Sequence, residues 1–214
     1  SSLTSVDVSK FDVSKVSSFA SMFSGCSSLT TLDLNNFNTG NVTSFSYMFN
    51  NCKLLTDIDV SNFDTSKATN MSYMFYGCAN LINLNLKNFV TTNVTNMCAM
   101  FDYCSSLESI DVSSFNTAKV TNMNSMFCYC SSLTSLDISN FDFSSVTKVV
   151  QMFRECAKLT NIDLSNFDTS RETDFGYMFS GCSSLTSLDL SNFNTAKVTY
   201  MKGMFENCSS LTSL

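Results

Sequence analysis

Apolar and polar residues follow a pattern that repeats every 26 residues from end to end of the chain. In each copy, one segment alternates aliphatic with polar residues, and a second segment places apolar residues at i, i+3, i+4 and i+7. We number the positions of one repeat from 1 to 26, so that position 26 is a cysteine in every copy. These cysteines are Cys26, Cys52, Cys78, Cys104, Cys130, Cys156, Cys182 and Cys208.

Each repeat is predicted to form a strand, a turn and a short helix. Positions 5 to 9 alternate between buried aliphatic and exposed polar residues, which is typical of a strand. Positions 12 to 16 are rich in turn residues. Apolar positions 19, 22, 23 and 26 fit one face of a helix of about two turns. Threonine at position 17, such as Thr43 or Thr69, is expected to cap this helix, and Gly25 to take a left-handed conformation after it. Residues such as Asn51 and Tyr103 at the glycine position suggest that the helix end varies.

None of these elements can bury its apolar face alone, so neighbouring repeats must stack into a continuous core. The sequence therefore predicts a single α/β solenoid over residues 1–214, a right-handed coil with a parallel sheet on one face and short helices on the other. Strand spacing gives a rod roughly 40 Å long. The predicted repeats are 1–26, 27–52, 53–78, 79–104, 105–130, 131–156, 157–182 and 183–208, followed by a partial copy at 209–214.

Composition excludes several functions. The chain of 214 residues has no histidine, which removes histidine-based catalysis and histidine metal sites. A net charge of -6 argues against a nucleic-acid partner, and no apolar run approaches the ~18 residues of a membrane span. The first residues lack a leader pattern and enter directly into the repeat pattern, so we expect a fragment of a longer protein. We predict no enzyme activity and assign no catalytic residue and no metal ligand.

Residues 183–208 carry the consensus most clearly, as Ser-Ser-Leu-Thr-Ser-Leu-Asp-Leu-Ser-Asn-Phe followed by the Met-Phe pair and Cys208. This pattern resembles the 26-residue repeat of bacterial surface proteins, the BspA-like branch of the leucine-rich repeats, over the whole chain. The resemblance implies a leucine-rich-repeat-like solenoid on a secreted or surface-anchored protein, and some members are adhesins. One departure is that phenylalanine, as in Phe37, replaces the usual buried asparagine, which stands one position earlier, as in Asn36. The usual asparagine ladder therefore does not carry over directly.

Aspartate at position 7 is the strongest candidate for a binding surface. We call these residues the aspartate row; they are Asp7, Asp33, Asp59, Asp111, Asp137, Asp163 and Asp189. They should lie one strand apart on the exposed sheet face. Carboxylates at this spacing can share a calcium ion, which is the one cofactor we consider. The alternative is a solubilising row of charges that discourages aggregation of sheets.

The cysteine column has two interpretations, as a stack of disulfide-bonded or metal-binding thiols or as buried apolar filler. The second is favoured, because parallel side chains do not favour disulfide geometry and zinc sites usually need CxxC pairs or histidine. The Met-Phe pairs at positions 22 and 23 are expected to be core. Cys98 and Cys128 fall outside the column and have no predicted role.

Irregular residues in single repeats are further candidates. Phe143, Val146, Val149 and Val150 make one repeat more apolar, and Val90 replaces a polar residue, so they could form an exposed patch for a partner, although drift is a simpler explanation. Glu172 stands where other repeats have Val or Ala. We expect it to point outward or to pair with a cation such as Lys148 or Lys197.

The leading hypothesis is an extracellular surface module for adhesion or protein binding, in which many weak contacts add up along a repetitive face. The partner would be a protein or glycan on a host or neighbouring cell. The alternative is a structural stalk or a subunit that assembles into filaments through open solenoid ends. The extracellular location rests on the resemblance alone.

Overall fold

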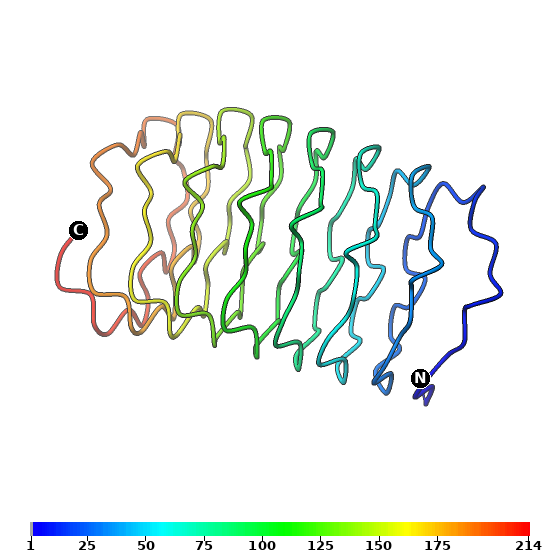
Figure 1. Cartoon of the computed structure of the whole chain (residues 1–214). Coiled ribbons are helices and arrows are strands. Elements are labelled where there is room, and N and C mark those ends of the chain that lie inside the picture. Colours follow the sequence, from blue (N-terminus) through cyan, green and yellow to red (C-terminus); the bar gives the residue numbers. More distant parts are fainter. Residues whose placement is uncertain (1) are drawn as a thin grey trace.

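The structure of the chain, a computed structural model, describes residues 2–214. The chain winds coil upon coil into an elongated solenoid, with its two ends at opposite ends of the molecule (Figure 1). Backbone hydrogen bonds link residues one repeat apart; for example, the N–H of Thr69 donates to the carbonyl of Thr43 at 2.8 Å. The coils therefore follow the period of the sequence, and the prediction of a repeat solenoid is confirmed.

The prediction of a short helix in each repeat is wrong, since residues 2–214 contain no α-helix. Positions 19 to 26 form consecutive tight turns, in which the N–H groups of Met48 and Cys52 donate to the carbonyls of Phe45 and Phe49, each at 3.1 Å. Positions 21 and 25 have left-handed backbone, with φ of 57° at both Tyr47 and Asn51. An L-residue in this conformation interrupts a right-handed helix. The expected left-handed residue at position 25 is confirmed, and it occurs whether that residue is glycine or not.

The remaining N–H groups of these turns reach the next coil. The N–H groups of Phe45, Tyr47, Phe49 and Asn51 donate to carbonyls 25 residues ahead, at 3.0, 2.9, 2.9 and 2.6 Å. Alternate amides are thus used within the coil and between coils, which satisfies the buried backbone groups that a helix would have satisfied internally. We call positions 17 to 26 of the coils the turn face.

The predicted strands at positions 5 to 9 are extended but pair sparsely. Parallel bridges occur there between Asp57 and Asn83 and between Ser187 and Ser213, with a contact from the N–H of Ile82 to the carbonyl of Thr56 at 3.1 Å. Most bridges lie on the turn face instead, at position 18, as between Ser44 and Asn70. The expected arrangement, a regular sheet opposite a layer of helices, is therefore replaced by a backbone ladder on the face where helices were expected.

The predicted core is confirmed. Leu29, Met48, Phe49 and Cys52 have no exposed surface, and the same positions are buried in the inner coils. Phenylalanines at position 23 stack along the solenoid axis, with ring centroids of Phe75 and Phe101 5.9 Å apart. Such stacks stabilise the core beyond the contribution from burying the rings.

Asparagine at position 10 forms a ladder of its own. The amide of Asn140 donates to the carbonyls of Val112, Ser113 and Phe115 in the preceding coil, at 3.1, 3.3 and 2.8 Å. We call these residues the asparagine row: Asn36, Asn62, Asn88, Asn140, Asn166 and Asn192. An asparagine ladder thus exists, displaced by one position from the usual leucine-rich repeat.

Threonines are used between coils rather than as helix caps. At position 17, the hydroxyl of Thr69 donates to the carbonyl of Thr43 at 3.2 Å, so the predicted capping role is wrong. At position 13, the buried hydroxyl of Thr117 donates to the carbonyl of Asp142 at 2.9 Å and accepts its N–H at 2.7 Å. Both rows therefore link successive coils through hydroxyl-to-backbone hydrogen bonds.

The cysteine column is buried apolar filler with a weak hydrogen bond. The thiol of Cys104 donates to the carbonyl of Phe75 at 3.2 Å, and other members of the column make the same contact. All ten cysteines are free thiols in the structure. Burial raises the pKa of Cys52 to about 12 and raises that of Cys104 well above its usual value.

We predict that thiol reagents will distinguish buried from accessible cysteines. In the native protein, labelling should be confined to the three partly exposed thiols, Cys26, Cys98 and Cys208, because thiolate formation and access are both suppressed at the seven buried thiols. Mass spectrometry after a short maleimide pulse measures this, with a denatured sample as the control for complete labelling. Rapid native labelling of Cys104 or Cys130 would contradict the buried packing.

Candidate functional site

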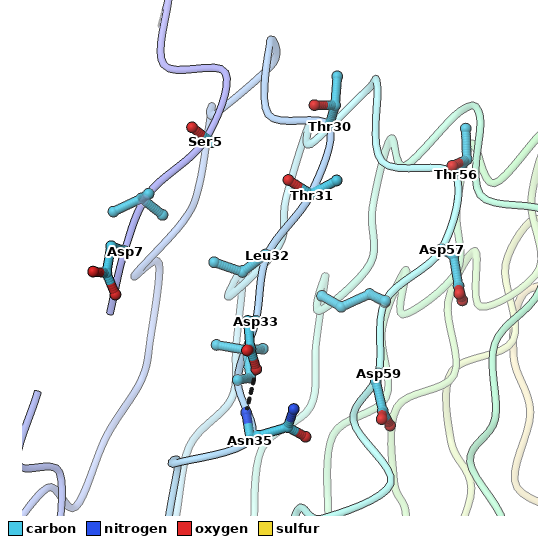
Figure 2. A pocket seen from close by; sticks show the side chains of 13 residues that line it. Ser5, Asp7, Thr30, Thr31, Leu32, Asp33, Asn35, Thr56, Asp57 and Asp59 are labelled. Carbon is cyan, nitrogen blue, oxygen red and sulfur yellow. Dashed lines mark hydrogen bonds between the residues drawn. The ribbon is translucent and has the colours of Figure 1, made fainter. Parts of the chain in front are cut away.

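The aspartate row lies exposed along one side of the solenoid, as predicted. Figure 2 shows Asp7, Asp33 and Asp59 on three successive coils, beside a shallow hollow of about 650 Å³ that threonines and aliphatic residues also line. Among residues 2–214, no three His, Cys, Asp or Glu side chains gather in a way that could hold a metal ion.

Each aspartate of this row also has a role within its own coil. The carboxylate of Asp7 accepts the N–H of Ser9 at 2.9 Å, and the same contact with the residue two positions ahead recurs at Asp33, Asp59, Asp111, Asp137, Asp163 and Asp189. Hydrogen bonds from the serine hydroxyl and N–H hold the pKa of Asp7 below its usual value. A short polar side chain that accepts the N–H two residues ahead favours a turn.

The same motif recurs at two other corners of the coil. At position 12, Asp64 accepts the N–H of Ser66 at 3.0 Å, and at position 18, Asn70 accepts that of Ser72 at 3.0 Å. The repetition of aspartate at position 7 is therefore explained in part by the folding of each coil, and a charge is not needed there, since Asn85 makes the contact with the N–H of Lys87 at 3.2 Å.

Three of the residues considered as members of an exposed patch in the irregular repeat are not at the surface. Phe143, Val146 and Val149 are 2% exposed or less, and Phe143 packs on Phe167 with centroids 4.1 Å apart. Phe143 takes the place of the buried threonine of other coils and fills the interior instead of the surface. Val90, by contrast, is 42% exposed.

Glu172 also differs from expectation, because it is buried instead of pointing outward or pairing with a cation. It is 1% exposed, and its Oε1 atom has no hydrogen-bond partner in the described structure. Burial, together with the nearby charge of Asp174, raises the pKa of Glu172 to about 7. Asp102 on the turn face is similar, with an unpartnered Oδ1 atom and a pKa that burial raises to about 7.

Tyrosines form a surface feature that the repeat analysis missed. All seven tyrosines fall at positions 18, 21, 24 or 25, on the turn face. Six of them join a continuous chain of ring contacts with two cations across successive coils. We call this chain the tyrosine strip; in order along the solenoid it comprises Tyr47, Tyr73, Tyr76, Tyr103, Tyr129, Arg154, Tyr177 and Lys202.

The strip is closely stacked. Ring centroids are 4.5 Å apart for Tyr47 and Tyr73, and 4.2 Å apart for Tyr103 and Tyr129. The guanidinium of Arg154 lies 5.6 Å from the ring centre of Tyr129 and 5.2 Å from that of Tyr177, within the range of cation–π attraction. The stacking joins side chains that belong to different coils.

Backbone conformation makes tyrosine a costly choice at these positions. Five residues of the strip have left-handed φ values between 55° and 61°, namely Tyr47, Tyr73, Tyr103, Tyr129 and Tyr177. A left-handed L-residue costs roughly 1–2 kcal/mol, which glycine avoids. Glycine does occupy the same positions in other coils, as Gly77 with φ of 69° and Gly203 with φ of 60°. The fold therefore accommodates these tyrosines but does not require them.

The geometry defines a leucine-rich-repeat solenoid. Its structure is similar to that of a leucine-rich repeat protein from Eubacterium ventriosum, with a TM-score of 0.56 and 21% identity, covering 90% of this chain and 56% of that one. The chain belongs to the family described as "Mycoplasma protein of unknown function, DUF285", whose profile matches residues 2–81, 55–160 and 131–213.

Two further solved structures are more distant. They are a leucine-rich repeat protein of T. pallidum, with a TM-score of 0.48, 20% identity and coverage of 99% of this chain and 79% of that one, and a leucine rich cell surface protein of Faecalibacterium prausnitzii, with a TM-score of 0.35, 20% identity and coverage of 91% and 74%. The chain spans little more than half of the Eubacterium protein in that structure. No curated protein matches the chain. Within the described residues, no helix is long and apolar enough to cross a membrane.

Proposed function

We propose that this chain is a non-enzymatic binding module of an extracellular surface protein and that it mediates adhesion through many similar contacts along the solenoid. The observation that carries the proposal is the aspartate row, which presents one exposed carboxylate from most coils at a regular spacing. The similarity to bacterial leucine-rich repeat proteins supports the same function.

The physical basis of the proposal is avidity. A single exposed carboxylate contributes little to binding, because its charge is well solvated and screened by salt. Several carboxylates held on one rigid scaffold bind a partner with repeated cationic groups as one unit, so that later contacts form at high effective concentration. The partner would be a surface protein or glycan of a host or neighbouring cell. Calcium bridging between the row and the partner is a variant of the same proposal.

Removing charges from the aspartate row should weaken adhesion. We expect the fourfold variant Asp33→Asn, Asp59→Asn, Asp111→Asn and Asp137→Asn to lower adhesion of chain-coated beads to cultured epithelial cells by about tenfold, because binding through avidity falls steeply when contacts are lost. Asparagine keeps the oxygen that accepts the N–H of the turn, so the fold should survive. The measurement is bead adhesion at graded coating density, with and without calcium.

A charge-matched control is available at position 12. The variant Asp12→Asn, Asp64→Asn, Asp142→Asn and Asp168→Asn removes the same number of charges from turns of the same design. If both variants lose adhesion equally, net charge and not the aspartate row is responsible. Absence of saturable adhesion by the unmodified chain would overturn the proposed function, and filaments that lengthen with concentration in electron micrographs would favour the structural alternative.

A further inference from the structure

Comparison of the coils with one another separates scaffold from variable surface. The leucine at position 3, the phenylalanine at position 11 and the Met-Phe pair at positions 22 and 23 are the same in every full repeat, and the aspartate row is nearly so. Positions 20, 21, 24 and 25 differ from coil to coil although they lie on the most regular backbone of the molecule. In a solenoid, the surface that varies over a constant scaffold is the surface free to be adapted to a ligand.

The tyrosine strip occupies this variable surface, and its side chains are neither fully buried in the core nor scattered singly over the surface. Tyr47 and Tyr103 are 37% and 42% exposed, and the other four tyrosines are partly buried by their neighbours. Five of the six tyrosines have a left-handed backbone that does not call for tyrosine, since glycine and residues such as Ser21, Asn51 and Ala99 take it at the same positions in other coils.

The strip is also preorganised. The N–H groups of Tyr47, Tyr73 and Tyr103 donate to carbonyls of the following coil at 2.9, 2.8 and 2.8 Å, and those of Tyr129 and Tyr177 at 2.7 and 2.8 Å. Backbone and ring positions are thus fixed before a ligand arrives, which lowers the entropy lost on binding. Rigid tyrosines supply large contact areas with few rotatable bonds, as in antibody paratopes.

The chemistry of the exposed atoms favours a polypeptide over a sugar. The flat faces of Tyr47, Tyr73, Tyr103 and Tyr129 are turned toward one another, and Arg154 covers further ring surface. A sugar ring packs on an open aromatic face, whereas ring edges and phenolic hydroxyls suit the alternating apolar and hydrogen-bonding groups of an extended peptide. The strip also runs from coil to coil along the solenoid, so its shape matches an extended segment.

A hollow within the strip is suited to one side chain of such a segment. It encloses about 300 Å³ and is lined by Asn51, Lys53, Tyr76, Gly77, Ala79 and Tyr103. Lys53 is the one charged residue among those that line this hollow. Along the rest of the strip, the cations Arg154 and Lys202 are accompanied by carboxyl groups on the same turns, those of Asp102, Glu155 and Glu206. The ammonium of Lys53 therefore favours a carboxylate from the ligand at the hollow itself.

We propose that the tyrosine strip is the contact surface for an extended segment of a partner protein, with an acidic side chain of that segment seated in the hollow between Tyr76 and Tyr103. This inference rests on the proposed function as a binding module and assigns recognition to a different face from the aspartate row. Contacts with the aspartate row could then add avidity, while the strip provides selectivity.

Selection from a library of random dodecapeptides displayed on phage, with the full chain as the target, tests the inference. We expect enriched peptides to share an Asp or Glu and to bind the variant Tyr103→Gly/Tyr129→Gly at least about tenfold more weakly, since removing central aromatic residues causes the largest losses at interfaces. Glycine suits the left-handed backbone at both positions, so the variant should melt at or near the temperature of the unmodified chain. A Lys53→Ser variant should lose the preference for the acidic residue.

The matched control is Tyr200→Ser, which removes a tyrosine that is 45% exposed on the same face but outside the strip. Peptides that bind the strip variant as well as the unmodified chain would overturn the inference while leaving the binding function intact. Peptides that instead depend on the aspartate row would do the same. Failure to enrich any peptide, or a strip-dependent signal on a glycan array alone, would also overturn it; only the absence of adhesion to cells as well would reject the proposed function.

Discussion

Replacing Glu172 by valine is expected to stabilise the protein by about 3 kcal/mol at pH 8. Position 16 holds valine in most coils, and the neighbouring Val146 is fully buried. Glu172 is buried there with an unpartnered carboxylate oxygen, and its pKa of about 7 lies well above the ordinary 4.5. Since each pKa unit corresponds to about 1.4 kcal/mol, keeping this group charged in the interior costs about 3 kcal/mol. Urea unfolding followed by tyrosine fluorescence measures the difference.

The same residue predicts the direction of the pH dependence. A carboxyl group whose pKa is raised on folding binds its proton more tightly in the native state, so stability falls as pH rises through the interval between the two pKa values. For Glu172 this interval runs from 4.5 to about 7, and for Asp102 from 3.8 to about 7. The lowered pKa values of exposed aspartates such as Asp7 act only at more acidic pH.

The unmodified protein should therefore be most stable near pH 4 to 5 and lose stability toward pH 8. Glu172→Val should remove about half of this loss of stability. Adding Asp102→Ser should remove most of the remainder; serine is already present at this position of the repeat in two other coils, as Ser24 and Ser180. A stability that is unchanged between pH 5 and pH 8, or a Glu172→Val variant that is less stable than the unmodified chain at pH 8, would show that Glu172 has a partner in solution.

Substituting alanine for Asn140 should destabilise the solenoid by about 2–3 kcal/mol. The side chain donates to three carbonyls of the preceding coil, and removing it leaves these carbonyls without that donor in a partly buried corner. The effect should appear as a lower urea midpoint, again followed by tyrosine fluorescence. Because the amide of Asn140 joins its own coil to the preceding one, the loss of stability should be local to the interface of these two coils and should weaken the coupling between them.

Two other residues of position 10 provide controls. Asn88 donates to the more exposed carbonyl of Ser61 at 2.8 Å, so Asn88→Ala should cost clearly less. Ser114 occupies the same position with a hydroxyl that reaches the carbonyl of Leu86 at 3.1 Å, so Ser114→Asn should stabilise the protein by extending the asparagine row. Equal effects of Asn140→Ala and Asn88→Ala would show that the number of carbonyls contacted is irrelevant.

The period and the core could be predicted from sequence, because burial selects apolar side chains at fixed spacing. The spacing of the apolar residues did not determine which backbone conformation, a helix or a series of turns, points them inward. Positions 19, 22, 23 and 26 point inward equally well from a helix and from a series of turns, and the choice depends on hydrogen bonds to the next coil, which no single repeat encodes. Gly203, at position 21, was the one sequence signal for a second left-handed residue within the supposed helix.

The candidate sites, like the fold, could be predicted from the sequence only in part. The exposure of the aspartate row followed from alternation, but its contact with the N–H two residues ahead required knowledge of the turn that follows. Glu172 was expected at the surface because a lone carboxylate is rarely buried without a partner. The tyrosine strip was missed because a search for common features of the repeats discards the positions at which they differ, and its members meet only when coils are stacked.

The ladder on the turn face also determines how the molecule would bear tension. Its backbone hydrogen bonds run from coil to coil, so a force that separates the two ends of the chain would break them successively from the outermost coil inward. Each released coil would lengthen the chain by roughly 80 Å, given about 3.3–3.6 Å for each of its 26 residues less the spacing it had when stacked. A protein that holds two surfaces together would then extend stepwise under load, dissipating energy with each coil, and could rewind when the load is removed.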